Sequence, residues 1–104
     1  MERGEVRWAR LPPPVGRRPV LLLSRNRAYQ IRKSITVAPI TRTIRDIPVE
    51  VALDESDGMP TRCAVNLDDI LTVPIRLIED RITTLSGEKM SRVREAIAFA
   101  LDLA

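Results

Sequence analysis

Two adjacent arginines, Arg17 and Arg18, stand directly before Pro19 and a run of large aliphatic residues, 20–23. A strand that enters a hydrophobic core does not need positive charges at its mouth, so these side chains are candidates for contacting a ligand. A guanidinium presents a planar fork of N–H donors that matches the oxygens of a phosphate. The pair therefore indicates an anionic, phosphate-bearing partner.

Positive charge is concentrated in the first half of the chain. Residues 1–45 carry eleven Lys or Arg against two acidic residues, whereas residues 46–104 carry six against twelve, within a net charge of +3. Fifteen of the seventeen basic residues are arginine. A basic half indicates an anionic partner, of which nucleic acid is the commonest. The alternative is a compositional preference for arginine codons with no functional meaning.

Several kinds of chemistry are excluded by composition. The chain has no histidine and a single cysteine, Cys63, which removes the commonest general acid–base group and any internal disulfide. Nothing clusters around Cys63 as a metal site. No apolar run approaches the ~20 residues of a membrane span, and the N-terminus does not read as a secretory signal. We therefore expect one cytoplasmic domain, 1–104, that needs no cofactor and no metal.

The hydrophobic pattern predicts a mainly β protein that positions these arginines on strand ends. The strict period of two in 47–53 is the clearest strand signal, and the apolar run within 18–24 indicates a strand buried on both faces. Pro39 suggests that its strand lies at an edge or ends at a bulge. Strands are expected at 5–11, 18–24, 34–40, 47–53 and 61–67, with a short continuation at 71–73 and a last strand at 81–85. The polar stretch 25–33 is expected to be a connection that could contain a helical turn.

The C-terminus changes to helical spacing. Ser86 is a candidate N-cap, and Met90, Val93, Ile97 and Leu101 mark one face of a helix of about four turns. Six or so short strands and one terminal helix indicate a small barrel or twisted sheet, of the mainly β or α+β class. Composition and periodicity name no reaction.

Three stretches, taken together and in this order, resemble the MazF/PemK (Kid) family of bacterial toxins: RGEV.W..L with GRRPVLLLS, VAPIT at 37–41, and AVNLDDILTV at 64–73 with the closing RITTLSGEKMSRVREAI. The resemblance implies a small SH3-like barrel of the CcdB/PemK/MazF kind with a C-terminal α-helix, assembled as a homodimer. It also implies the toxin of a type II toxin–antitoxin system, a metal-independent, sequence-selective endoribonuclease (mRNA interferase) acting on single-stranded RNA. An acidic or disordered segment of a MazE-like antitoxin is expected to block the RNA groove.

The resemblance also assigns catalytic residues, namely Arg18, Thr41 and Asp68. In such cleavage the RNA 2′-hydroxyl attacks the adjacent phosphorus and leaves 2′,3′-cyclic phosphate and 5′-hydroxyl ends. Arg18 would stabilise the extra-negative phosphorane, Thr41 would hydrogen-bond the phosphate or orient the 2′-hydroxyl, and Asp68 is a candidate base. The Kid branch has an arginine where this chain has Asn66, so its acid–base pair carries over only in part. RNA contacts are expected from Arg17, Arg25, Asn26, Arg42 and Asn66.

Each of these residues also has an interpretation without function. Arg18 could solvate a strand end or pair with Asp46, Thr41 could satisfy backbone groups at a strand end, and Asp68 could cap the turn that follows it. Arg17, Arg25 and Arg42 could simply be solvated.

We interpret Trp8, Tyr29 and Phe99 as packing residues rather than platforms for base stacking, and Tyr29 is the best exception among the three. Cys63 is expected to be a small buried hydrophobe. Two other functions share the fold. A CcdB-like DNA gyrase poison depends on a tryptophan near the C-terminus, where this chain has only Phe99. A catalytically inactive relative that binds RNA or antitoxin is disfavoured by the pair Arg18 and Thr41.

Overall fold

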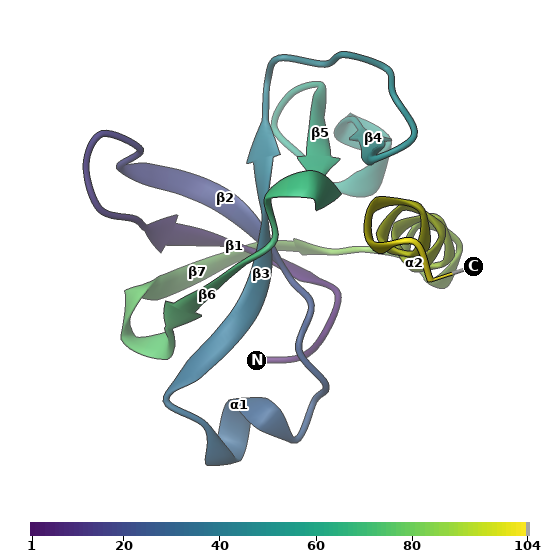
Figure 1. Cartoon of the computed structure of the whole chain (residues 1–104). Helices are drawn as coiled ribbons and strands as arrows, with labels where there is room; N and C mark the ends of the chain where they lie inside the picture. The colour runs from purple at the N-terminus through teal and green to yellow at the C-terminus, as the bar shows by residue number, and fades with distance from the viewer. Residues whose placement is uncertain (104) are drawn as a thin grey trace.

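One antiparallel sheet makes up most of the fold (Figure 1). The computed structural model describes residues 1–103, and its strands follow the order β4-β5-β3-β2-β1-β7, with β6 pairing with β3 outside this path. Its elements are β1 (Glu5–Arg10), β2 (Arg17–Leu22), α1 (Ala28–Ile31), β3 (Ser34–Thr41), β4 (Glu50–Leu53), β5 (Cys63–Asn66), β6 (Leu71–Pro74), β7 (Ile78–Thr84) and α2 (Gly87–Leu101). Short 3-10 turns cover Glu55–Asp57, Leu67–Asp69 and Ile75–Leu77. The mainly β prediction with a terminal helix is confirmed.

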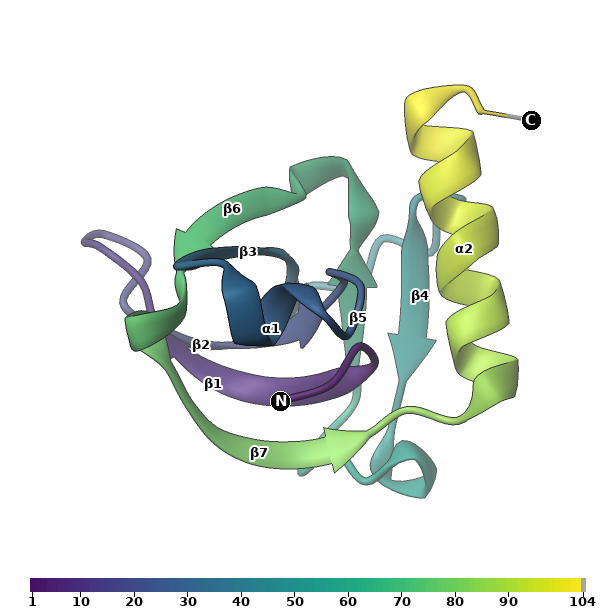
Figure 2. The ribbon, with the colours of Figure 1, turned by 90° about the horizontal axis from the view of Figure 1, so that it is seen from below.

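The sheet curls into a half-barrel and buries both of its faces (Figure 2). Side chains alternate along a strand, so neighbours on β2 enter different clusters. Leu21 joins a first cluster that includes Val65 and Val93, where α2 packs against β4 and the Leu67–Asp69 turn. Val20 joins a second cluster with Val37 and others on β6 and β7. The prediction of a doubly buried strand within 18–24 is thus confirmed.

Strands β2 and β3 each contain one proline, and the two strands separate beside these prolines. Residues Val20–Leu22 of β2 pair with Val37–Pro39 of β3, and the pairing stops there. Before Val20, residues Arg17–Pro19 pair with β1 alone, and after Pro39, Ile40 and Thr41 pair with β5. A proline has no N–H to donate to a ladder, and Pro19 and Pro39 flank the point of separation. We call this opening between the two strands the fork.

Of the two alternatives expected for Pro39, an edge or a bulge, the edge is wrong. β3 is interior to the sheet, since it pairs with β2 on one side and with β6 and β5 in succession on the other. Pro39 falls between the β6-paired segment 34–37 and the β5-paired segment 40–41. No partner strand on that side therefore needs its missing N–H.

The strand expected over 47–53 begins only at Glu50. Asp46 has φ 55°, a left-handed conformation that breaks the extended chain, and a turn bond from the Glu50 N–H to the Ile47 carbonyl follows it at 2.9 Å. Ile47 is exposed, whereas Val49 remains buried. The alternation of apolar residues therefore predicted the burial of the second half of the segment but not its backbone.

The terminal helix α2 begins as predicted, because the Ser86 hydroxyl accepts a hydrogen bond from the Lys89 N–H at 3.1 Å. Val93 is fully buried, but Leu101, expected on the same apolar face, is 57% exposed because it lies in the last turn, next to Asp102 in the left-handed conformation that ends the helix. None of the helices within residues 1–103 has the length and apolar character to cross a membrane.

Candidate active site

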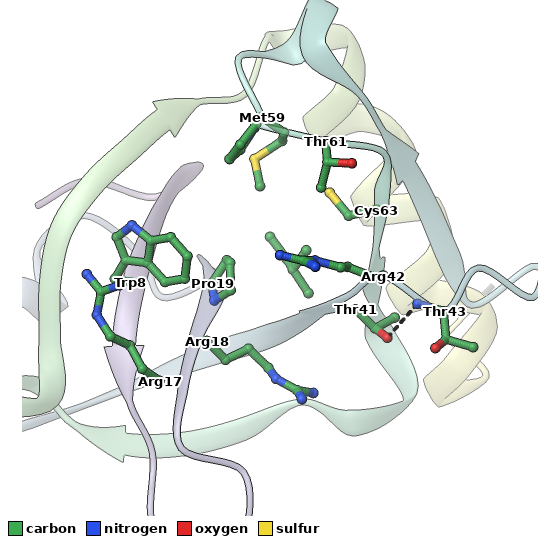
Figure 3. Close-up of a pocket in the computed structure, with 12 residues that line it drawn as sticks. Trp8, Arg17, Arg18, Pro19, Thr41, Arg42, Thr43, Met59, Thr61 and Cys63 are labelled. Atoms are coloured by element: carbon green, nitrogen blue, oxygen red, sulfur yellow. Dashed lines mark hydrogen bonds between the residues drawn. The ribbon is translucent and has the colours of Figure 1, made fainter.

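The fork opens into a pocket of about 390 Å³ (Figure 3). Strands β1, β2 and β3 supply one side of it, and the segment that precedes β5 supplies the other. Its lining contains three arginines and three threonines but no carboxylate among the residues described, namely Trp8, Arg17, Arg18, Pro19, Ile40, Thr41, Arg42, Thr43, Met59, Pro60, Thr61 and Cys63. The pocket is therefore strongly positive and rich in hydroxyl groups.

Arg18 and Thr41 come from opposite sides of the fork. If the β2–β3 register of Val20 with Pro39 continued, Arg18 would lie directly across from Thr41. Because the strands separate instead, the two side chains face a shared space rather than a ladder (Figure 3). The sequence expectation that these two residues meet is matched by their placement, while their catalytic roles stay predictions.

Both side chains are available to a ligand. Among residues 1–103 no carboxylate forms an ion pair with Arg18, and Asp46 instead lines a separate groove between β4 and α2. The Thr41 oxygen accepts a hydrogen bond from the Thr43 N–H at 3.1 Å. Its hydroxyl proton stays free to be donated, because an O–H is both donor and acceptor. The arrangement suits an anion with several oxygens.

Arg17 is held differently from its neighbour Arg18. Its guanidinium carbon lies 4.2 Å from the centre of the Trp8 ring, and its Nε donates to a Glu79 carboxylate oxygen at 3.1 Å. Arg10 contacts the other oxygen of Glu79 at 3.0 Å. The hydrogen bond from Arg17, with the charges of both arginines, lowers the pKa of Glu79. Arg17 therefore contributes a flat, stacked cation rather than a free charge.

The wall before β5 depends on a glycine. Gly58 has φ +91°, and a Cβ there would collide with the Thr83 side chain of β7. The Thr83 hydroxyl donates to the Asp57 carbonyl at 2.9 Å, which fixes the wall against the sheet. Cys63 is buried in this wall as expected, and burial, followed by the charges of Asp57 and Asp54, raises the pKa of its thiol. The thiol is therefore protonated at neutral pH.

Four other predicted site residues do not line this pocket. Asp68 is exposed in the turn after β5, and it does not cap that turn. Asn66 does, by accepting from the Asp68 N–H at 3.0 Å while donating to Asp69 at 2.8 Å. Arg25 and Asn26 follow the opposite end of β2 from Arg18, and the Asn26 oxygen accepts from the Arg3 N–H at 2.6 Å. The structure thus gathers Arg17, Arg18, Thr41 and Arg42 but not these four.

The packing interpretation of the three aromatic residues is confirmed for Tyr29 and is wrong for Trp8 and Phe99. Trp8, expected to pack, belongs to neither buried cluster and lines the pocket. Tyr29, also expected to pack, packs against the second cluster and donates its hydroxyl to the Ser24 carbonyl at 2.9 Å. Burial raises the pKa of that hydroxyl to about 12. Phe99 is 62% exposed on α2. The alternation of side chains predicts Trp8 on the same face as the buried Val6. At Trp8, however, this face of the sheet borders the fork and its pocket rather than the core.

Comparison with known proteins decides the family. A sequence model described as "PemK-like, MazF-like toxin of type II toxin-antitoxin system" matches residues 2–101. The chain belongs to this family. It is 40% identical to the Mycobacterium tuberculosis protein named "Probable endoribonuclease MazF5", over 96% of this chain and 92% of that protein.

Solved structures agree with this family assignment. "Mycobacterium tuberculosis toxin MazF-mt6" superposes with a TM-score of 0.88 at 32% identity, covering 96% of this chain and 98% of that one. A mycobacterial endoribonuclease in complex with its cognate antitoxin also gives 0.88, at 29% identity, covering 100% of this chain and 97% of that one. The fold is therefore that of the MazF-like toxins, as the sequence motifs implied.

Proposed function

We propose that Arg18 and Thr41 form the RNA-cleaving centre of this MazF-family endoribonuclease toxin. The observation that carries the proposal is the fork, in which an unpaired guanidinium and a hydroxyl with a free proton face one positively charged pocket. The substrate is single-stranded RNA, because the reaction needs a flexible phosphodiester with a neighbouring 2′-hydroxyl. The products are 2′,3′-cyclic phosphate and 5′-hydroxyl ends.

Arg18 stabilises the charge that develops during attack. As the 2′ oxygen bonds to phosphorus and the bond to the 5′ oxygen breaks, the phosphorane oxygens gain negative charge. A guanidinium held at a strand end before Pro19 needs little reorganisation to bind two of these oxygens. Within residues 1–103 no carboxylate forms an ion pair with Arg18, so its charge is available to the phosphate.

Thr41 supplies a hydrogen bond rather than a base. Its hydroxyl is far too weakly acidic to ionise at neutral pH, so it cannot act as the base. It can donate a hydrogen bond to a non-bridging phosphate oxygen. The attacking 2′-hydroxyl must lose one proton and the departing 5′ oxygen must gain one. Since neither imidazole nor carboxylate lines the described pocket, these transfers are assigned to solvent, and the acceleration comes from Arg18 and Thr41.

The partners follow from the same positive surface. Arg18 and Arg42 favour an anionic occupant of the pocket, so an acidic segment of a MazE-like antitoxin would inhibit by competing with RNA. A homodimer would place two such pockets on one assembly and lengthen the RNA-binding surface. We place the protein in the cytoplasm, where its RNA substrate is made.

The test is cleavage of a mixed RNA in EDTA, with the new ends mapped and chemically identified. We expect cuts at a short motif with cyclic phosphate or its hydrolysis product. Arg18→Ala and Thr41→Ala should each lower kcat/KM about 100-fold, the scale for losing one preorganised donor. Arg32→Ala and Thr72→Ala are matched controls, because both are exposed and neither lines the pocket.

Three outcomes would contradict the proposal. Unchanged cleavage by both pocket variants would mean that the site is elsewhere. Cleavage that requires Mg²⁺ would overturn the mechanism, and inhibition of DNA supercoiling without any RNA nicking would favour a gyrase poison.

A further inference from the structure

Trp8 is a large aromatic side chain that the core does not use. It is half-buried, lies in neither hydrophobic cluster and lines the same pocket as Arg18 and Thr41. An aromatic residue normally enters a core because its burial is strongly favourable. Its position in a positively charged pocket instead leaves a π face accessible to a planar ligand.

The Trp8 ring is not alone in this position. Arg17 stacks on it at 4.2 Å, and Glu79 fixes the Arg17 guanidinium through Nε. Glu79, whose pKa is lowered by its contacts with Arg17 and Arg10, carries a negative charge at neutral pH as an ordinary carboxylate does. The charge of Arg17 is therefore largely balanced, which makes it a poorer phosphate ligand than Arg18. The flat face of the Arg17 guanidinium can still stack on a ligand. RNA bases stack on guanidinium planes and on aromatic rings such as indole.

The strand geometry separates these planes from the cleaving pair. Trp8 lies opposite Pro19 in the β1–β2 ladder, and side chains alternate, so Trp8 and Arg17 lie on one face of the sheet and Arg18 on the other. Both faces reach the pocket only because the sheet is open at the fork. A nucleotide with its phosphate at Arg18 therefore has the Trp8 side of the fork within reach of its base.

We propose that Trp8 and Arg17 form a base-stacking subsite that binds a nucleobase next to the scissile phosphate, with Glu79 positioning Arg17. The proposal rests on RNA being the substrate, as argued above. Stacking recognises the π face that every base has, so this subsite adds affinity and orientation rather than a full sequence code. Its contribution is the amount typical of one stacked base, about 5- to 150-fold in affinity.

Trp8 can report its own contact, because it is the only tryptophan of the chain. The probe is a randomised ten-nucleotide RNA with 2′-O-methyl on every sugar, which keeps bases and phosphates but cannot undergo 2′-hydroxyl attack. The control is an abasic ribose-phosphate oligomer of the same length. We expect the RNA to quench the fluorescence of Trp8 at saturation and the abasic oligomer to leave it nearly unchanged.

Two variants separate stacking from packing. Trp8→Leu keeps an apolar side chain but removes the π face, whereas Trp8→Phe retains a ring. We expect Leu to weaken binding of the 2′-O-methyl RNA about 5- to 150-fold and Phe to recover most of that loss, with equal binding of the abasic oligomer by all three proteins. Thermal melting of each variant shows whether it is folded.

The subsite is ruled out if saturating RNA leaves the fluorescence unchanged, if the abasic oligomer quenches equally, or if Trp8→Leu binds RNA as wild type does. RNA cleavage without quenching would remove the subsite and leave the proposed function standing. Quenching without cleavage would overturn the proposed function and leave Trp8 as part of an RNA-binding surface with no scissile phosphate beside it.

Discussion

Replacing Gly58 with alanine should destabilise the protein by more than its backbone angle alone explains. Gly58 has φ +91°, and the new Cβ would collide with Thr83. A left-handed conformation costs an L-residue about 1–2 kcal/mol. Moving Thr83 away also loses its hydrogen bond to the Asp57 carbonyl, about 0.5–1.5 kcal/mol. We therefore expect a loss of about 1.5–3.5 kcal/mol in the free energy of unfolding.

Gly16→Ala is the matched control for this prediction. Gly16 also has a positive φ, +70°, but a Cβ there meets nothing within 4 Å. It carries the same kind of backbone cost and the same change in the entropy of the unfolded chain, without the collision. Its loss should be about 1–2 kcal/mol.

The assay is urea unfolding at 25 °C, followed by far-ultraviolet circular dichroism. Gly58→Ala should cost less stability when it is made in the Thr83→Ala variant than when it is made in wild type, because the nearest clashing atom, the Thr83 hydroxyl oxygen, is then gone. If Gly58→Ala and Gly16→Ala prove equally destabilising, the contact between the pocket wall and β7 does not hold that wall, and this reasoning is refuted.

Two further predictions concern the acidic residues. Glu5 is buried and, although burial opposes its ionisation, its hydrogen bond and ion pair with Arg7 at 2.7 Å lower its pKa. Because the folded-state pKa lies below the unfolded value of 4.5, ionised Glu5 stabilises the protein above that value, and this stabilisation is lost as the pH falls through the folded-state pKa. In urea titrations Glu5→Gln should therefore cost about 1.5–3 kcal/mol at pH 7 and much less at pH 3. An equal cost at both pH values would contradict this prediction. Asp68→Asn should keep kcat/KM within about threefold of wild type, because Asp68 does not line the pocket; a ~100-fold loss would instead identify Asp68 as the proton acceptor.

Local patterns in the sequence predicted those elements whose signals are themselves local. The Ser86 cap and the doubly buried β2 need only neighbouring residues to be recognised. The late start of β4 was missed because Val49, Val51 and Leu53 alternate correctly while Asp46 turns the chain in a way that alternation does not encode. Leu101 was misplaced because its spacing cannot show that the helix ends beside it at Asp102.

The site was harder to predict because it depends on where two strands stop pairing. Motif resemblance named Arg18 and Thr41, but their placement across the fork follows from a register set by the chain between β2 and β3. The same separation exposes Trp8, which alternation alone assigns to the core with Val6. Residues of the wall, such as Met59 and Thr61, carried no signal in the sequence because their loop reaches the pocket only through tertiary contacts.

The claim that Arg18 and Thr41 act on one phosphate is tested most directly by a double-mutant cycle on kcat/KM. The measurement compares wild type, Arg18→Ala, Thr41→Ala and the double variant on one defined RNA. If both groups stabilise the same transition state in the fork, the double variant should be only slightly slower than the slower single variant, a strongly non-additive result. Losses that simply multiply, or no loss at either position, would contradict the account.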